Sequence, residues 1–228
     1  MVDSQRLRSV PEGIQLVSEV AAILSRSHGG TTHVLEIVSY FPVDVDSAGR
    51  ILEGLEEFQG VKRVQKDSIC YYELENPDLF SLREIDIEKE EHLDDAAGFM
   101  RALSTLKKDE DWVKKVREQH ELLQIAAGAK SRTIELSHFT SRSDIASAKI
   151  QSILNDFAAE GYISISYDEN NDTLNYTFPQ FAYPKRRMQH NLSLLERVET
   201  KNPVRPTLWL YVVVAAIILL GIIIFSRL

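Results

Sequence analysis

The C-terminal end of the chain carries the feature that most constrains its fold. Residues 208–225 read LWLYVVVAAIILLGIIIF and contain no charged side chain. A helix rises ~1.5 Å per residue, so about 19 residues from Thr207 would span roughly 28 Å, close to the hydrocarbon thickness of a bilayer. Trp209 and Tyr211 stand at one end, where amphipathic rings favour the headgroup region, and Arg227 follows the other end. The pattern predicts a transmembrane helix over residues 207–225.

The charges beside this segment predict its orientation. The basic residues of the preceding stretch include Lys185, Arg186, Arg187 and Arg205, and they outnumber the acidic ones. Such an excess marks the cytoplasmic side of a membrane segment, and the first 30 residues hold no signal-peptide h-region. We therefore expect a tail-anchored, single-pass protein bound to the lipid bilayer, with its N-terminal part in the cytoplasm. Residues 183–206 would form a basic juxtamembrane tether and residues 226–228 a short tail.

Composition limits the remainder of the chain. The 228 residues have a net charge of −8 and a single cysteine, Cys70. One cysteine excludes an intramolecular disulfide framework and suits a reducing compartment. About 206 residues precede the apolar run, enough for one large domain or two small ones.

Two stretches of the chain share the same predicted order of helices and strands, and the first covers residues 1–80. Apolar residues at helical spacing predict a helix over Ile14–Leu24. A short apolar segment, Val34–Phe41, follows and stops at Pro42. Asp46 or Ser47 would cap a further helix that ends at Gly60. Two strands, Val61–Gln65 and Ser68–Glu75, then predict a hairpin.

The second stretch, residues 112–182, runs the same way. Helical spacing predicts a helix over Trp112–Ala127, and the sequence TIEL over Thr133–Leu136 predicts a short strand. Ser141 or Ser143 would cap a short helix, after which apolar residues from Ile150 to Phe157 indicate another. Alternating residues over Tyr162–Tyr167 and Thr173–Phe178 predict a second hairpin.

The order of helix, short helix, helix and hairpin resembles the winged-helix superfamily. The segments AGRILEGLEEFQGVKRV (48–64) and KIQSILNDFAAEGYISI (149–165) resemble its third helix, glycine and first wing strand. The resemblance implies an α+β cytoplasmic part with two winged-helix-like domains of three helices plus a hairpin each. An acidic helical linker, residues 81–111, would join them, followed by the single transmembrane helix. Tandem winged helices occur in transcription factors and in protein-assembly factors, so the resemblance leaves the function open.

Motifs for chemistry are missing from the sequence. No glycine-rich phosphate loop is present, the six histidines show no metal-ligand spacing, and no serine stands in a nucleophile elbow. The sequence thus names no catalytic, cofactor-binding or metal-binding residue. We expect a protein that is not an enzyme and needs no cofactor.

Two functions remain after this search. The first is a membrane-tethered interaction or scaffold protein that recruits an unknown protein partner to a membrane face. The alternative is a membrane-tethered winged-helix DNA-binding transcriptional regulator. The third helix of the first copy carries Glu53, Glu56 and Glu57 against Arg50, a charge balance that disfavours contact with phosphates. DNA contacts are more plausible in the second copy, through side chains suited to base edges or phosphates: Arg142, Lys149, Gln151, Ser152 and Asn155.

Overall fold

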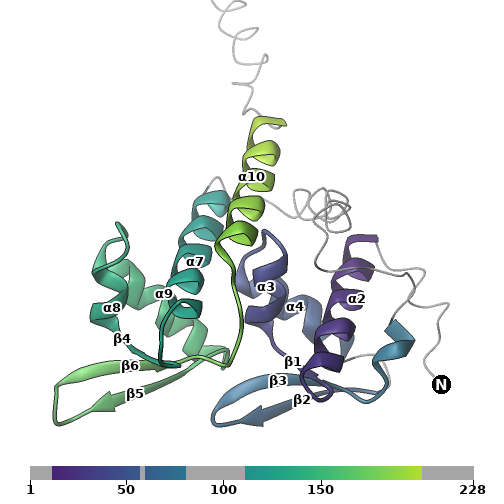
Figure 1. The fold of residues 1–228 in the computed structure, drawn as a ribbon, viewed down its shortest axis with the longest axis horizontal. Coiled ribbons are helices and arrows are strands. Elements are labelled where there is room, and N and C mark those ends of the chain that lie inside the picture. Colours follow the sequence, from purple (N-terminus) through teal and green to yellow (C-terminus); the bar gives the residue numbers. More distant parts are fainter. Residues whose placement is uncertain (1–11, 57–59, 81–110, 202–228) are drawn as a thin grey trace, which may run out of the picture. The chain divides into compact units, whose positions relative to one another are not determined.

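The computed structural model describes residues 12–56, 60–80 and 111–201 (Figure 1). In these residues the fold is α+β, with seven α-helices and two three-stranded sheets. Residues 1–195 form one compact unit and residues 196–228 a second. Within the first unit we call residues 12–80 the first half and residues 111–195 the second half.

The first half alternates helices with the strands of a small sheet. Its helices are α2 (Glu12–Ser27), α3 (Val34–Tyr40) and α4 (Val45–Leu55), and its strands are β1 (Thr31–Thr32), β2 (Val61–Lys66) and β3 (Ile69–Leu74). The strands pair antiparallel in the order β1-β3-β2, with Thr31 opposite Glu73 and Arg63 opposite Tyr72. A 3₁₀ turn, η1 (Pro77–Phe80), follows.

The second half has the same order of elements. Its helices are α7 (Trp112–Ala127), α8 (Leu136–Thr140) and α9 (Ser147–Ala159), and its strands are β4 (Thr133–Glu135), β5 (Ser164–Asp168) and β6 (Thr173–Thr177). The sheet order is β4-β6-β5, so β5 is an edge strand, as β2 is in the first half. The chain then enters α10 (Lys185–Lys201).

Local hydrogen bonds explain where several helices begin, and some predicted boundaries are wrong. Helix α4 is capped by Asp44, whose carboxylate accepts from Ser47 N–H at 3.0 Å, and not by Asp46 or Ser47. The apolar segment from Val34 is a helix because Nδ1 of His33 accepts the Glu36 N–H and caps it. The short helix α8 ends at Thr140 and so precedes Ser141, which was expected to cap it.

One apolar core serves both halves. Large side chains that are fully enclosed come from each half: Leu35, Ile37, Phe41 and Tyr72 from the first, and Phe139, Phe157, Tyr176 and Phe178 from the second. A continuous core means that neither half buries its apolar face alone, since each covers part of the other.

The predicted membrane anchor requires correction. Among the helices of residues 12–56, 60–80 and 111–201, none is long and apolar enough to cross a membrane. The last described helix, α10, has the length of a short membrane span but carries charges of both signs along it, as in Lys185 and Glu196. Residues 207–225, with Trp209, Tyr211 and Arg227, lie outside the described residues. The fold class is corrected to the α+β arrangement above, and the described residues do not support the single-pass, tail-anchored and membrane assignments.

Candidate functional site

Helix α7 holds the loop that precedes α4. Nε2 of His120 lies 2.8 Å from the carbonyl oxygen of Val43, and Oε1 of Gln119 accepts the Val45 N–H at 2.9 Å. Both side chains are buried. Two neighbouring residues of the second half thus bind two backbone groups of one loop in the first half, which would otherwise be buried without partners.

The same histidine continues into a longer chain of buried hydrogen bonds. The Tyr183 hydroxyl lies 2.5 Å from Nδ1 of His120 and accepts from Nδ2 of Asn191 at 3.1 Å. Nδ2 of Asn191 also donates to the Ser39 carbonyl at 3.3 Å. The chain begins and ends on backbone carbonyls of the first half, at Ser39 and Val43, so it ties α3 and the following loop to the second half.

The protons of His120 and Tyr183 can be placed from their hydrogen-bond partners. Because Val43 offers only an acceptor, Nε2 of His120 carries the proton and Nδ1 accepts from Tyr183. Burial lowers the pKa of His120 to about 4, with the Val43 carbonyl and Asp44 acting in the opposite direction. Burial raises the pKa of the Tyr183 hydroxyl. His120 is therefore neutral at physiological pH, as the hydrogen-bond directions require.

A second set of contacts joins α7 to the start of α4. Nε1 of Trp112 donates to Oδ2 of Asp44 at 2.8 Å, and Nζ of Lys115 lies 2.5 Å from Oδ2 of Asp46. Burial alone would raise the pKa of Asp44, but hydrogen bonds from Ser47 and Trp112 together with the Lys115 charge lower it overall. The helix cap at Asp44 is thus shared between the two halves.

The hairpin of the first half also contacts the second half. The Cys70 N–H donates to the Gly161 carbonyl at 2.7 Å, and the Arg63 guanidinium lies 3.3 Å from the Glu160 carbonyl. Gly161 has φ +75°, and a Cβ there would lie 2.8 Å from Sγ of Cys70. Glycine is required at this turn for both reasons.

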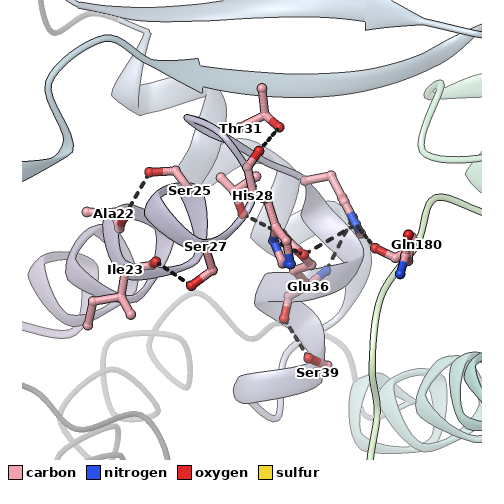
Figure 2. Close-up of polar contacts among 11 residues, drawn as sticks. Ala22, Ile23, Ser25, Ser27, His28, Thr31, Glu36, Ser39 and Gln180 are labelled. Carbon is pink, nitrogen blue, oxygen red and sulfur yellow. Dashed lines mark hydrogen bonds and ion pairs between the residues drawn. The ribbon is translucent and has the colours of Figure 1, made fainter.

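Figure 2 shows polar contacts of Glu36, a buried carboxylate on α3. Glu36 accepts from the Thr32 hydroxyl at 2.9 Å, and its Oε1 lies 2.8 Å from Nδ1 of His28. Burial raises the pKa of Glu36, while His28, Thr32 and the backbone at His33 act against it. The exposed His28 ring, at the end of α2, thereby anchors α3.

His33 links this cluster to the second half. Its Nε2 lies 3.2 Å from the Gln180 carbonyl, in the segment after β6, and its Nδ1 accepts the Glu36 N–H. Burial lowers the pKa of His33 to about 3, so the ring is neutral and holds its proton on Nε2. The polar side chains at the junction of the halves are thus engaged in joining elements to one another.

The residues predicted to contact DNA are not gathered on one uninterrupted face. Lys149, Ser152 and Asn155 are exposed on α9, but the Asn155 side-chain oxygen accepts from the Tyr176 hydroxyl at 3.1 Å, and Gln151 is half-buried. Arg142 lies outside α9, where its guanidinium donates to Nδ1 of His138 at 2.9 Å. Beside them, the turn after β5 is acidic.

The basic residues predicted to lie beside a membrane occur in the first turn of α10. Lys185 and Arg186 are exposed, and the Arg187 guanidinium lies 3.7 Å from the centre of the Tyr40 ring. Arg205 lies outside the described residues. Farther along α10, Asn191, Leu194 and Leu195 are buried, so this part of the predicted tether packs into the first compact unit.

The β5–β6 hairpin, which we call the second hairpin, presents apolar side chains to solvent. Ile165 is 45% exposed and Tyr167 is 56% exposed, and among the described residues no other large hydrophobic side chain is so exposed. Register places Ile165 opposite Tyr176 and Tyr167 opposite Leu174, so the four share one face of the hairpin. Tyr176 is fully buried and Leu174 is half-buried against the core, whereas Ile165 and Tyr167 on the opposing strand are exposed.

The tip of the second hairpin is acidic and well ordered by its own hydrogen bonds. Asp168 accepts from the Asn170 N–H at 2.9 Å and from the Asn171 side chain at 2.8 Å. The Tyr167 hydroxyl donates to Asp172. The apolar face therefore ends at a turn with carboxylates, and Figure 1 shows that turn pointing away from the helices.

Comparison with protein-family models and with curated proteins finds no match for this chain. Within the described ranges, no group of three or more His, Cys, Asp or Glu side chains is placed to hold a metal ion. The function therefore has to be inferred from the surfaces of the chain itself.

The sequence alone did not indicate Ile165 and Tyr167 as surface residues. The alternation of apolar and polar residues predicted the two strands of this hairpin, and their register places Ile165 and Tyr167 on one face with Leu174 and Tyr176. That pattern does not reveal how far α9 covers the face. Ile165 and Tyr167 lie on the edge strand β5, and Ile165 is exposed although Tyr176 opposite it is buried, so tertiary packing decides which residues of the face are covered.

Proposed function

We propose that this chain is an interaction or scaffold protein that recruits a protein partner through the exposed face of the second hairpin. The observation that carries the proposal is the pair Ile165 and Tyr167, both on the edge strand β5. Exposed apolar side chains that share one surface are typical of protein-binding sites, and tyrosine is frequent among the residues that contribute most to binding.

The edge position of β5 supports the same proposal. One side of this strand pairs with β6, and among the described strands none pairs with its other side. A partner strand placed there would gain backbone hydrogen bonds in addition to apolar contacts. The carboxylates of Asp168, Glu169 and Asp172 beside the face favour a partner that carries basic side chains near its own apolar residues.

The alternative function, DNA binding through α9, stays a prediction that we do not favour. A DNA-binding hairpin beside a recognition helix is expected to place basic side chains against the phosphates. The second hairpin instead places Asp168 and Asp172 at its tip. The expectation that the chain is not an enzyme likewise stays a prediction.

A pair of matched variants tests the proposed function. Ile165→Ser with Tyr167→Ser removes the apolar face, and Gln65→Ser with Lys66→Ser changes two exposed residues of the corresponding edge strand β2. Proteins bound to the wild-type chain and to each variant are quantified by affinity purification, and direct binding is then measured with the purified partner. We expect the partner to bind the wild type and the β2 variant alike, and the β5 variant at least about tenfold more weakly. Equal binding to all three chains would refute the proposal.

A further inference from the structure

A groove of about 1280 Å³ lies in the second half, away from the β5 edge. Its walls come from the C-terminal end of α7, the strand β4, the helix α8 and the segment that leads into α10. Ile125, Ala127, Ala129 and Phe181 line it as half-buried apolar side chains that pack on the core. The groove therefore has an apolar floor that packs on the core.

Three cationic side chains surround this floor. Lys130, Arg142 and Lys185 line the groove from three different segments, and all three are exposed. Among the ion pairs that involve the described residues, none includes any of these three cations. One carboxylate, Glu135, also lines the groove, and it accepts from the Ser137 hydroxyl at 3.0 Å.

This concentration of positive charge contrasts with the remainder of the chain. The whole chain has a net charge of −8, whereas the groove holds three cations against one carboxylate. Cations around an apolar floor are complementary to a ligand with carboxylates around an apolar side chain.

We propose that this groove binds an acidic segment of a partner protein, in which Asp or Glu residues flank one bulky apolar side chain. The apolar side chain packs on Ile125 and Phe181, while the carboxylates face Lys130, Arg142 and Lys185. Nucleic acid fits the groove less well, because Glu135 lies in the wall and the apolar floor offers nothing to a phosphate backbone.

Selection from a random peptide library displayed on phage tests the proposal, with the purified full-length chain as target. The groove variant carries Lys130→Glu, Arg142→Glu and Lys185→Glu. The control variant carries Lys62→Glu, Lys66→Glu and Lys149→Glu, which change the net charge equally at exposed positions elsewhere. We expect the wild type and the control to enrich peptides with Asp or Glu around an aromatic or large aliphatic residue. A synthetic form of such a peptide should bind the groove variant at least about tenfold more weakly.

Several outcomes would overturn the proposal. These are peptides without acidic enrichment, acidic peptides that bind the groove variant as tightly as the wild type, or a single-stranded oligonucleotide that displaces the peptide at equal concentration.

Self-association that excludes the peptide and disappears in the groove variant would assign the groove to a second copy of the chain. If the triple variant does not fold, judged by circular dichroism, the three single Gln substitutions at these positions replace it. The Ile165→Ser, Tyr167→Ser chain should bind the peptide normally, so the groove and the second hairpin are tested separately.

Discussion

The hydroxyl of Tyr183 lies 2.5 Å from Nδ1 of His120 in the interior of the molecule. These residues belong to the segment before α10 and to α7, and through His120 and Asn191 the hydroxyl is connected to two carbonyls of the first half. A buried chain of this kind is stabilising only when each donor has an acceptor, because an unmatched polar group in the interior destabilises the fold.

Tyr183→Phe tests the importance of that hydroxyl. The substitution keeps the ring but leaves Nδ1 of His120 and one N–H of Asn191 without their partner. We expect the free energy of unfolding to fall by about 1–3 kcal/mol. Urea unfolding followed by circular dichroism provides the measurement, with Tyr167→Phe on the exposed hairpin as the control, expected to change it by under about 0.5 kcal/mol. A change equally small for both variants would show that the buried chain contributes little.

Acidification should destabilise the protein through His33 and His120. The folded-state pKa values are about 3 and about 4, below the ordinary value of 6.5. Between pH 6.5 and pH 4 the unfolded chain therefore binds protons that the folded chain does not, and stability falls as the pH falls. Above pH 6.5 this contribution is constant. Each histidine adds a slope of about 1.4 kcal/mol per pH unit at most.

Neighbouring carboxyl groups modify this pH dependence, so a variant that removes one histidine is needed as the control. Glu36 acts with the opposite sign, because burial raises its pKa and acidification then favours the folded state. Asp44, whose pKa is lowered from 3.8, contributes only below this window. His33→Asn keeps a capping acceptor for α3 and removes one titrating group, so the slope of unfolding free energy against pH should become shallower. An unchanged slope would contradict the assignment.

Two glycines of α4 should respond to alanine in opposite directions. A Cβ at Gly49 would lie 2.0 Å from the Tyr162 hydroxyl, whereas a Cβ at Gly54 meets nothing within 4 Å. Because Tyr162 is buried and its hydroxyl would have to move, Gly49→Ala should destabilise the fold by about 1–3 kcal/mol. Gly54→Ala should stabilise it by about 0.4–1 kcal/mol, since alanine restricts the unfolded chain. Thermal unfolding of the two variants side by side is the measurement, and a loss of stability in both would rule out this explanation.

Sequence-specific binding to duplex DNA should be absent at physiological salt. The chain has a net charge of −8, and both Glu53 on α4 and Glu56, the C-cap of α4, are exposed. Selection from random duplexes at about 150 mM salt, with the wild type and Lys149→Glu in parallel, should enrich no motif. An enriched motif that is lost in the Lys149→Glu chain would favour the DNA-binding alternative. Weak binding that only declines as salt rises would not, because the basic residues from Lys185 to Arg205 suffice for it.

Local patterns in the sequence located most of the secondary structure. Helix α7 begins and ends where the apolar spacing predicted, and both hairpins lie within a few residues of their predicted strands. The helix at Val34–Tyr40 was less evident, because a short apolar run does not distinguish a helix from a strand. Its capping residue, His33, is also held by Gln180, which is distant in the sequence.

The apolar run at residues 207–225 lies outside the described residues. Composition alone favoured a membrane segment, yet in the part of the chain that the structure describes no helix is suited to cross a membrane. The sequence also predicted a tether over residues 183–206. In the structure, Tyr183 and Asn191 of this range lie in the buried hydrogen-bond chain. Neither side chain carries a local signal for this role, because the hydrogen-bond partners that connect them to the core, His120 and the Ser39 carbonyl, lie far away in the sequence.

The sequence by itself determined the order of helices and strands, because spacing, capping residues and turns act over a few neighbouring residues. The tertiary structure decided which surfaces remain for function. Whether Tyr167 is covered depends on how other elements pack around the edge strand β5, and whether Lys130, Arg142 and Lys185 surround one groove depends on how three segments pack. Both are distances between elements far apart along the chain, and a pattern confined to neighbouring residues does not specify them.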